Sequence, residues 1–119
     1  MEYSESQEMY LKAIYQISLA KTKVRKIDIA NELGLSKPSV TNAINRLISL
    51  DMVQIDETNG ILLTATTQAH AEKLYVRYRT IFELLVANGV SKEHAKEAAC
   101  KLEHALDDDI FNLIVAHTK

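Results

Sequence analysis

Three residues near the C-terminus have side chains that can bind a metal ion. Cys100, Glu103 and His104 are spaced at i, i+3 and i+4, so on a helix all three emerge from one face within about one turn. A thiolate, a carboxylate and an imidazole that converge in this way can hold a transition metal. The same spacing also fits a cysteine buried as a small apolar side chain beside a solvated Glu–His pair. The spacing alone leaves both interpretations open.

A second set of polar residues lies on a predicted helix that begins after Ser36 and ends near Leu50. Ser36 is a favourable N-cap, and Pro38 falls in the first turn, where no backbone N–H is needed. An apolar stripe with spacing i, i+4 and i+7 must pack inward, at Val40, Ile44 and Leu47. The remaining face carries short hydrogen-bonding side chains and two cations, at Lys37, Ser39, Thr41, Asn42, Asn45 and Arg46. This composition suits a DNA groove, although a solvated helix face can have the same composition.

The residues around this helix have the layout of a helix-turn-helix. A short helix with apolar residues at 27–33 ends at Gly34, so the motif extends from Lys26 to Leu50. The formal net charge of the whole chain is −2, yet residues 21–46 hold six Lys or Arg against two acidic residues. Because phosphates are contacted by one face of a protein, this local basic stripe outweighs the total charge.

A β-hairpin is predicted directly after the helix that ends near Leu50. Residues 52–55 and 61–63 have strand composition, and Asn59 and Gly60 between them tolerate a positive φ. A hairpin in this place makes the unit a winged helix. Asp56 and Glu57 make the wing tip acidic, which predicts that the tip does not grip phosphate strongly.

The other elements are predicted to be helices. Residues 4–20 form an amphipathic helix, with Ser4 or Ser6 as its N-cap. A long helix follows Thr64 and is apolar on two sides, so it needs two partners, one of which can be another subunit. Two further helices complete the chain, the last beginning at the acidic triplet 107–109. The fold class is therefore mostly α with a small β-hairpin, a winged helix-turn-helix in residues 1–64 followed by a helical lobe in residues 65–119.

Composition excludes several classes of protein. The chain has 119 residues, of which 47% are hydrophobic and 25% charged, as in an ordinary globular protein. Its single cysteine, Cys100, excludes an internal disulfide and fits a reducing cytoplasm. No apolar run reaches membrane-spanning length and no signal peptide is visible, so a cytoplasmic protein without a membrane partner is expected. No Gly-rich phosphate loop or activated nucleophile indicates an enzyme.

Three stretches, residues 8–15, 28–41 and 97–104, resemble the diphtheria toxin repressor family of iron- and manganese-dependent bacterial repressors, in the family's order and spacing. The resemblance implies a transcriptional repressor of metal-homeostasis genes that binds a palindromic operator in double-stranded DNA as a homodimer. It also implies that the second lobe binds metal and dimerises, and that the chain is a short form without the SH3-like lobe of longer members.

The resemblance implies a set of four metal ligands. The iron branch of the family uses a Met in the first helix and Cys, Glu and His on a later helix, and this chain has Met9, Cys100, Glu103 and His104 at those positions. The manganese branch has carboxylates where Met9 and Cys100 stand. A thioether and a thiolate favour softer ions than Mn²⁺, so Fe²⁺ is expected over Mn²⁺.

The second metal position of the family is altered in this chain. Its histidine, its acidic partner and a further ligand fall at Tyr78, Phe82 and Lys96, and a carboxylate of the manganese branch falls at Lys12. A phenol, a phenyl ring and two ammonium groups cannot rebuild that site. We expect one ion per subunit, with loss of metal control as the alternative.

The helix-turn-helix supplies the predicted DNA contacts. Base-edge contacts are expected from Ser36, Pro38, Ser39 and Asn42, and phosphate contacts from Lys26, Lys37, Thr41 and Arg46. Two other functions fit the same sequence. One is a winged-helix regulator of this fold that ignores metal, and the other is a protein-interaction module that uses the apolar helix at residues 74–86.

Overall fold

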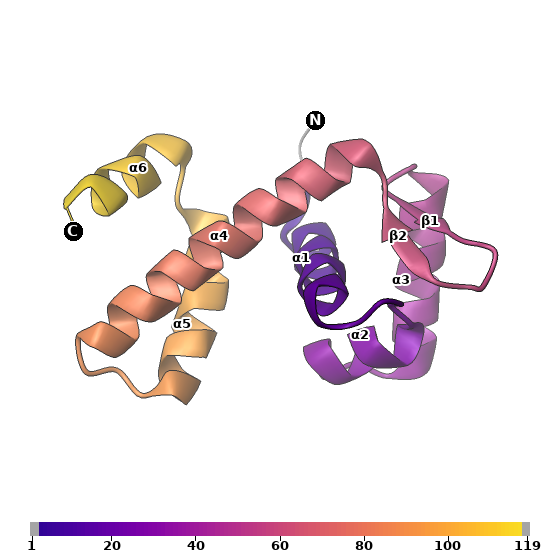
Figure 1. Ribbon diagram of the computed structural model, residues 1–119, viewed down its shortest axis with the longest axis horizontal. Helices are drawn as coiled ribbons and strands as arrows, with labels where there is room; N and C mark the ends of the chain where they lie inside the picture. Colours follow the sequence, from indigo (N-terminus) through magenta and orange to yellow (C-terminus); the bar gives the residue numbers. More distant parts are fainter. Residues whose placement is uncertain (1–2, 118–119) are drawn as a thin grey trace. The chain divides into compact units, whose positions relative to one another are not determined.

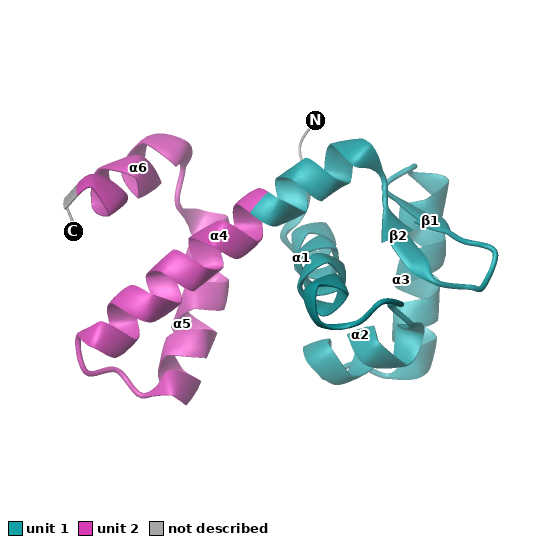
Figure 2. Cartoon of the chain, viewed as in Figure 1, with its two compact units in different colours: residues 1–72 teal, residues 73–119 magenta. Residues whose placement is uncertain are grey.

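The computed structural model describes residues 3–117 and divides into two units, one up to Glu72 and one from Lys73 (Figure 2). Each unit is described separately. The division falls within the long helix α4, Ala65–Ala87, which belongs partly to each unit. The division that the sequence predicts, between residues 64 and 65, coincides with the start of this helix and stays a prediction.

The first unit packs three helices and a two-stranded hairpin around one core (Figure 1). In chain order its elements are α1 (Glu5–Ala20), α2 (Lys26–Leu33), α3 (Lys37–Ser49), β1 (Val53–Ile55), β2 (Ile61–Leu63) and the start of α4. The centre of the core is fully buried and is formed by Leu11 and Ile14 of α1, Ile29 of α2 and Ile44 of α3. These residues fall on the apolar stripes of their helices, so burial of the stripes fixes α3 against α1 and α2.

Local capping signals set the helix ends as the sequence predicts. The hydroxyl of Ser4 accepts a hydrogen bond from the backbone N–H of Gln7 at 3.0 Å, and the Gln7 side chain accepts one from the Ser4 N–H at 2.9 Å. This reciprocal capping box starts α1. Gly34 ends α2 with a φ of 66°, and Ser36 caps α3 by accepting from the N–H of Ser39 at 3.3 Å. The helix-turn-helix predicted from the sequence is thereby confirmed.

The wing is an antiparallel hairpin in which Val53 pairs with Leu63 and Ile55 with Ile61. Asn59 takes a φ of 66°, whereas Gly60, which was also expected to use this freedom, has no positive φ. Residues 21–25, between α1 and α2, form a linker without regular secondary structure. Its Val24 carbonyl accepts a hydrogen bond from the Ile61 N–H at 2.9 Å, which ties the linker to the wing.

The second unit consists of the rest of α4, followed by α5 (Lys92–Ala105) and α6 (Asp108–His117) (Figure 1). Tyr78, Ile81 and Ala99 form its buried centre. Together the two units confirm the predicted fold class, mostly helical with a winged helix-turn-helix followed by a helical lobe. Among the helices of residues 3–117, none is both long and apolar enough to cross a membrane.

Candidate nucleic-acid interface and metal centre

The outward face of α3 carries most of the predicted DNA contacts. Lys37, Pro38, Ser39, Asn42 and Arg46 are exposed, and Thr41 is half-buried. Val40, Ile44 and Leu47 are buried on the opposite side of the helix, as their spacing predicts. Burial of this stripe leaves the polar side chains pointing away from the core, where they can meet a ligand.

Two of the predicted base-contacting residues also hold the start of α3. The hydroxyl groups of Ser36 and Ser39 are hydrogen-bonded to each other at 2.9 Å, and Ser36 also accepts from the Ser39 N–H. Asn42, one turn further along the helix, is exposed. The amide of Asn42 is therefore accessible, as the prediction that it bonds an adenine edge bidentately requires.

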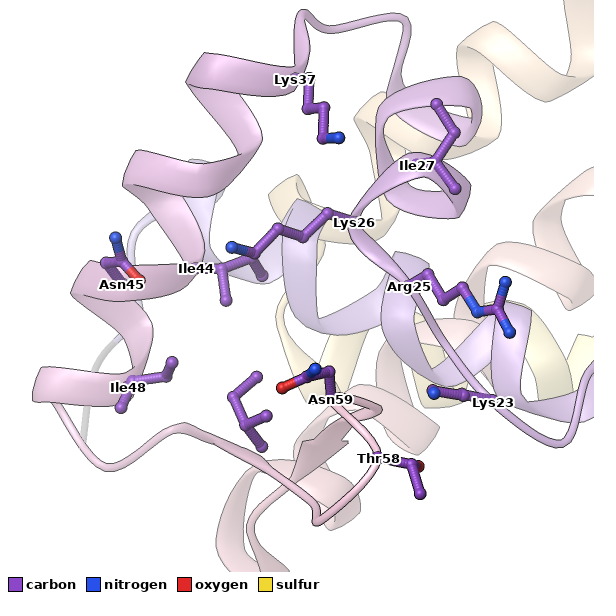
Figure 3. Close-up of a pocket in the computed structure, with 11 residues that line it drawn as sticks. Lys23, Arg25, Lys26, Ile27, Lys37, Ile44, Asn45, Ile48, Thr58 and Asn59 are labelled. Atoms are coloured by element: carbon purple, nitrogen blue, oxygen red, sulfur yellow. The ribbon is translucent and has the colours of Figure 1, made fainter.

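A pocket of about 550 Å³ lies between the linker, α2, α3 and the wing (Figure 3). Its lining includes four cations, Lys23, Arg25, Lys26 and Lys37, of which the sequence predicted only Lys26 and Lys37 as contacts. The lining is completed by four isoleucines (Ile27, Ile44, Ile48 and Ile55) and by Asn45, Thr58 and Asn59. The basic composition of residues 21–26 is visible in the sequence, but the pocket is not, because it needs the folded wing beside α3.

The acidic wing tip is organised differently from what its composition suggests. One carboxylate oxygen of Asp56, Oδ1, accepts hydrogen bonds from the Thr58 N–H at 2.8 Å, the Thr58 hydroxyl at 2.9 Å and the Gly60 N–H at 2.8 Å. These bonds, led by the one from Gly60, hold the pKa of Asp56 below its usual value. A Cβ at Gly60 would lie 2.5 Å from Asp56 Oδ2, so the turn closes tightly on the carboxylate. Asp56 therefore stabilises the turn that presents Thr58 and Asn59.

We expect acid to loosen the wing tip. Because the pKa of Asp56 is lowered in the folded state, the stability that its carboxylate contributes is present above the unfolded value of about 4 and is lost as the pH falls through the folded pKa. Amide hydrogen exchange at Thr58 and Gly60 should accelerate over that range, after correction for the intrinsic rate. The Asp56→Asn variant should lack this pH dependence, and Glu57→Gln should keep it. Protection that persists well below the pH at which Asp56 protonates would contradict the assignment.

The metal-binding triplet predicted from the sequence lies on α5 in the second unit. Glu103 Oε1 is 3.2 Å from His104 Nε2, and both side chains are buried. Cys100 is half-buried and packs against the cluster of Tyr78, Ile81 and Ala99. Within the part of the chain that the structure describes, no three His, Cys, Asp or Glu side chains form a ready-made metal site. The three residues thus share one side of α5, and Glu103 and His104 lie within contact distance of each other.

The fourth predicted ligand, Met9, lies on α1 in the first unit, where it is 39% exposed. By chemistry the four donors fit a divalent transition metal, because a thioether, a thiolate, a carboxylate and an imidazole form a mixed S, O and N set. A buried carboxylate beside an imidazole is also an arrangement that needs strong polar partners. The donor set therefore fits the ion, and all four residues remain predictions as its ligands.

Two of the positions that the family resemblance assigns to a second metal, Tyr78 and Phe82, belong to an aromatic cluster. Tyr78 is 7% exposed, and its ring stacks on Phe82 with 5.9 Å between ring centroids and lies 6.4 Å from Tyr75. Lys96 is exposed on α5. Phe82 supplies no metal-binding atom, and its ring contributes to packing. This part of α4 therefore stabilises the unit through packing.

Both halves of the chain match models of one protein family. Residues 2–61 match the N-terminal DNA-binding domain of the iron-dependent repressors, and residues 64–119 match the metal-binding and dimerisation domain of the same repressors. An HTH-type transcriptional regulator of Methanocaldococcus jannaschii is 35% identical, over 91% of this chain and 88% of that protein. The transcriptional regulator MntR of Salmonella typhimurium is 28% identical, over 92% of this chain and 70% of that protein.

Solved structures show the same arrangement of elements. T. acidophilum IdeR superposes with a TM-score of 0.78 at 28% identity, over 98% of this chain and 54% of that chain. The manganese regulator SloR superposes with a TM-score of 0.76 at 29% identity, over all of this chain and 56% of that one. The present chain thus spans little more than half the length of these two structures. The matches confirm the resemblance drawn from the sequence: the chain belongs to the iron-dependent repressor family, a family of transcriptional repressors and not of enzymes.

Proposed function

We propose that the protein is a metal-activated repressor that binds a palindromic operator as a homodimer and responds to Fe²⁺ in preference to Mn²⁺. The observation that carries this proposal is the buried pair of Glu103 and His104, one turn from Cys100, on a helix of the metal-binding domain. Thiolate and thioether ligands favour the softer ion. The regulated genes are expected to be those of metal homeostasis.

The ligand set is drawn from both units, with Met9 on α1 and the other three residues on α5. A bound ion would be held by the side chains of these four residues. Binding by residues of both helices favours one arrangement of the two recognition helices in a dimer, and an operator with half-sites about one helical turn apart selects that arrangement. One ion per subunit follows from the aromatic packing of Tyr78 and Phe82 at the second position.

In the proposed complex, α3 lies in the major groove. Asn42, Pro38, Ser39 and Ser36 contact base edges, and Lys26, Lys37, Thr41 and Arg46 contact phosphates. Arg46 and Lys37 are exposed at the two ends of α3, so they can reach phosphates on either side of the bases that Asn42 reads.

The Asn42→Ala variant tests this function. Loss of a bidentate base contact costs about 1–3 kcal/mol of discrimination, which corresponds to roughly 5-fold to 150-fold in the ratio of operator to scrambled-sequence affinity. The measurement is fluorescence anisotropy with DNA from the protein's own promoter region, with Fe²⁺, with Mn²⁺ and with chelator. Ser49→Ala is the matched control on α3, because the Ser49 hydroxyl already donates to the Arg46 carbonyl at 2.7 Å. An unchanged ratio for Asn42→Ala would refute the role of Asn42.

A second candidate is a regulator of the same fold that ignores metal. The aromatic side chains at the second position and Lys12 in α1, which is 7% exposed, favour it because a fixed packing or a fixed ammonium can replace an ion structurally. The same anisotropy experiment separates the two candidates. Affinity that rises with Fe²⁺ and falls with chelator supports metal activation, whereas equal affinity in all conditions supports the metal-independent regulator.

A further inference from the structure

We propose that the pocket between the linker, α3 and the wing seats a stretch of DNA sugar-phosphate backbone, with Lys23 and Arg25 as additional phosphate contacts and Asp56 as the residue that positions the wing against it. This inference rests on the proposed DNA binding. It adds a contact surface outside the predicted base-reading and phosphate-contacting residues (Figure 3).

The charge of the pocket suits phosphate. None of its four cations, Lys23, Arg25, Lys26 and Lys37, forms an ion pair among the residues that the structure describes, and the described lining contains no carboxylate. The neighbouring carboxylate of Asp28 is instead paired with Lys21 at 2.6 Å. Lys23 and Arg25 interact electrostatically with the carboxylates of Asp56 and Asp28 without forming ion pairs, so the four cations of the pocket keep a surplus of positive charge that backbone phosphates can neutralise.

The apolar part of the lining distinguishes a nucleic-acid backbone from a bare anion. Ile27 is 49% exposed, Ile48 38% and Ile55 39%. Exposed isoleucines beside cations match the backbone of DNA, in which apolar sugar edges alternate with charged phosphates. A free inorganic anion would use the cations and leave the isoleucines in water.

The pocket adjoins the helix that is proposed to read bases. Lys37, Asn45 and Ile48 of α3 line the pocket (Figure 3). Asn42 belongs to the same helix and is exposed. A strand seated in the pocket therefore runs beside the bases that Asn42 is proposed to contact. Lys23 and Arg25 extend the cationic surface away from α3 along the linker.

The wing closes one side of the pocket through a turn that the exposed carboxylate of Asp56 holds by hydrogen bonds. Asp56 Oδ1 accepts three hydrogen bonds within the hairpin, and Thr58 and Asn59, which follow it, line the pocket. The Asp56 carboxylate stays ionised, because these hydrogen bonds lower its pKa, and it stabilises the loop that presents Thr58 and Asn59 to the pocket. Asp56 is in this sense a positioning residue and not a DNA contact.

The test is the salt dependence of operator binding by the double variant Lys23→Ala/Arg25→Ala. Each lost phosphate contact lowers the slope of log Kd against log salt by about 0.9, so the double variant should have a slope about 1.8 smaller than that of the wild type, with an unchanged ratio of operator to scrambled-sequence affinity. Lys21→Ala is the matched control, because Lys21 is paired with Asp28 and lies outside this pocket. Its slope should stay within about 0.3 of the wild type.

Loss of an apolar contact in the pocket should change the affinity for DNA but not its salt dependence. Ile48→Ala should weaken binding by about fivefold at every salt concentration without changing the slope, because the loss of apolar contact is not screened by ions. At neutral pH, Asp56→Asn should leave the slope of log Kd against log salt unchanged, because the amide oxygen of Asn can still accept hydrogen bonds within the turn. Thermal unfolding of each variant checks that the first unit is folded, and binding is compared only among folded variants.

The outcomes separate this inference from the proposed function. A wild type that binds its operator, together with a double variant of unchanged slope, overturns the inference and leaves DNA binding intact. Competition by millimolar inorganic phosphate, beyond that of sulfate at equal ionic strength, would assign the pocket to a free anion and overturn the backbone proposal. Absence of operator binding by the wild type under all metal conditions removes the proposed function, and the inference with it.

Discussion

Cys100→Ala should lower the affinity of the protein for Fe²⁺ or Co²⁺ by about 100-fold or more. Loss of an outer-shell partner already costs 10-fold to 100-fold in metal affinity, and Cys100 is proposed as a direct ligand. The thiolate is also the softest donor of the set, so its removal should lower the affinity for Co²⁺ more than that for Mn²⁺. The preference for softer ions should therefore fall together with the affinity.

Equilibrium dialysis under reducing conditions measures this affinity, and Co²⁺ adds a near-ultraviolet thiolate absorption band as a direct signature. Cys100 is the only cysteine, so that band reports on this site alone. Glu97→Gln is the control on α5, because Glu97 is exposed, and it should leave both affinity and spectrum unchanged. Glu103→Gln keeps the volume of the buried side chain and should also weaken binding. Equal weak binding by the wild type and Cys100→Ala would exclude the proposed site.

The parts of the fold that the sequence predicts are those with local signals. Gly34 and Ser36 define the turn between α2 and α3 because a left-handed residue and an N-cap each act within a few residues of their own position. The buried stripe of α3 follows from its spacing. The hairpin follows from its two strand segments and from Asn59 between them. In each case the residues that carry the signal lie within one element or one turn.

What the sequence does not predict depends on contacts between distant residues. The acidity of the wing tip predicts weak phosphate binding there, and the sequence does not show that Asp56 also holds the turn together by hydrogen bonds to Thr58 and Gly60. Lys23 and Arg25 belong to a basic stripe in the sequence, yet only the folded wing and α3 make them part of a pocket. The predicted metal ligands fall between these cases, because the helical spacing places Cys100, Glu103 and His104 on one side of α5, while Met9 is predicted only from the family resemblance.

Replacement of Arg77 by Met should lower the free energy of unfolding by about 2–3 kcal/mol. Arg77 contacts residues that lie far from it in the sequence. Its side chain is 8% exposed and donates a hydrogen bond to the Leu106 carbonyl at 2.6 Å. It also pairs with Asp108 at the start of α6, and its guanidinium lies 5.2 Å from the centre of the Phe111 ring. Arg77 thus holds α6 against α4 by three kinds of contact.

The expected loss in the free energy of unfolding is smaller than for a fully buried ion pair, because Asp108 is 61% exposed. Asp108 also lies 2.8 Å from Lys73, and this ion pair would remain in the variant. Arg77→Lys should recover only part of the stability, since an ammonium lacks the fork that reaches both the Leu106 carbonyl and Asp108.

Arg79→Met is the matched control two residues along α4. Arg79 is 51% exposed and lies 3.6 Å from Glu83, which is 63% exposed, so the loss of this pair should cost less than about 0.5 kcal/mol. Urea unfolding followed by circular dichroism, at one fixed protein concentration, compares the two variants. Equal small losses would show that the contacts of Arg77 do not stabilise α6. A large loss for Arg77→Met alone would show that the second unit depends on a buried cation directly beside Tyr78 of the aromatic cluster.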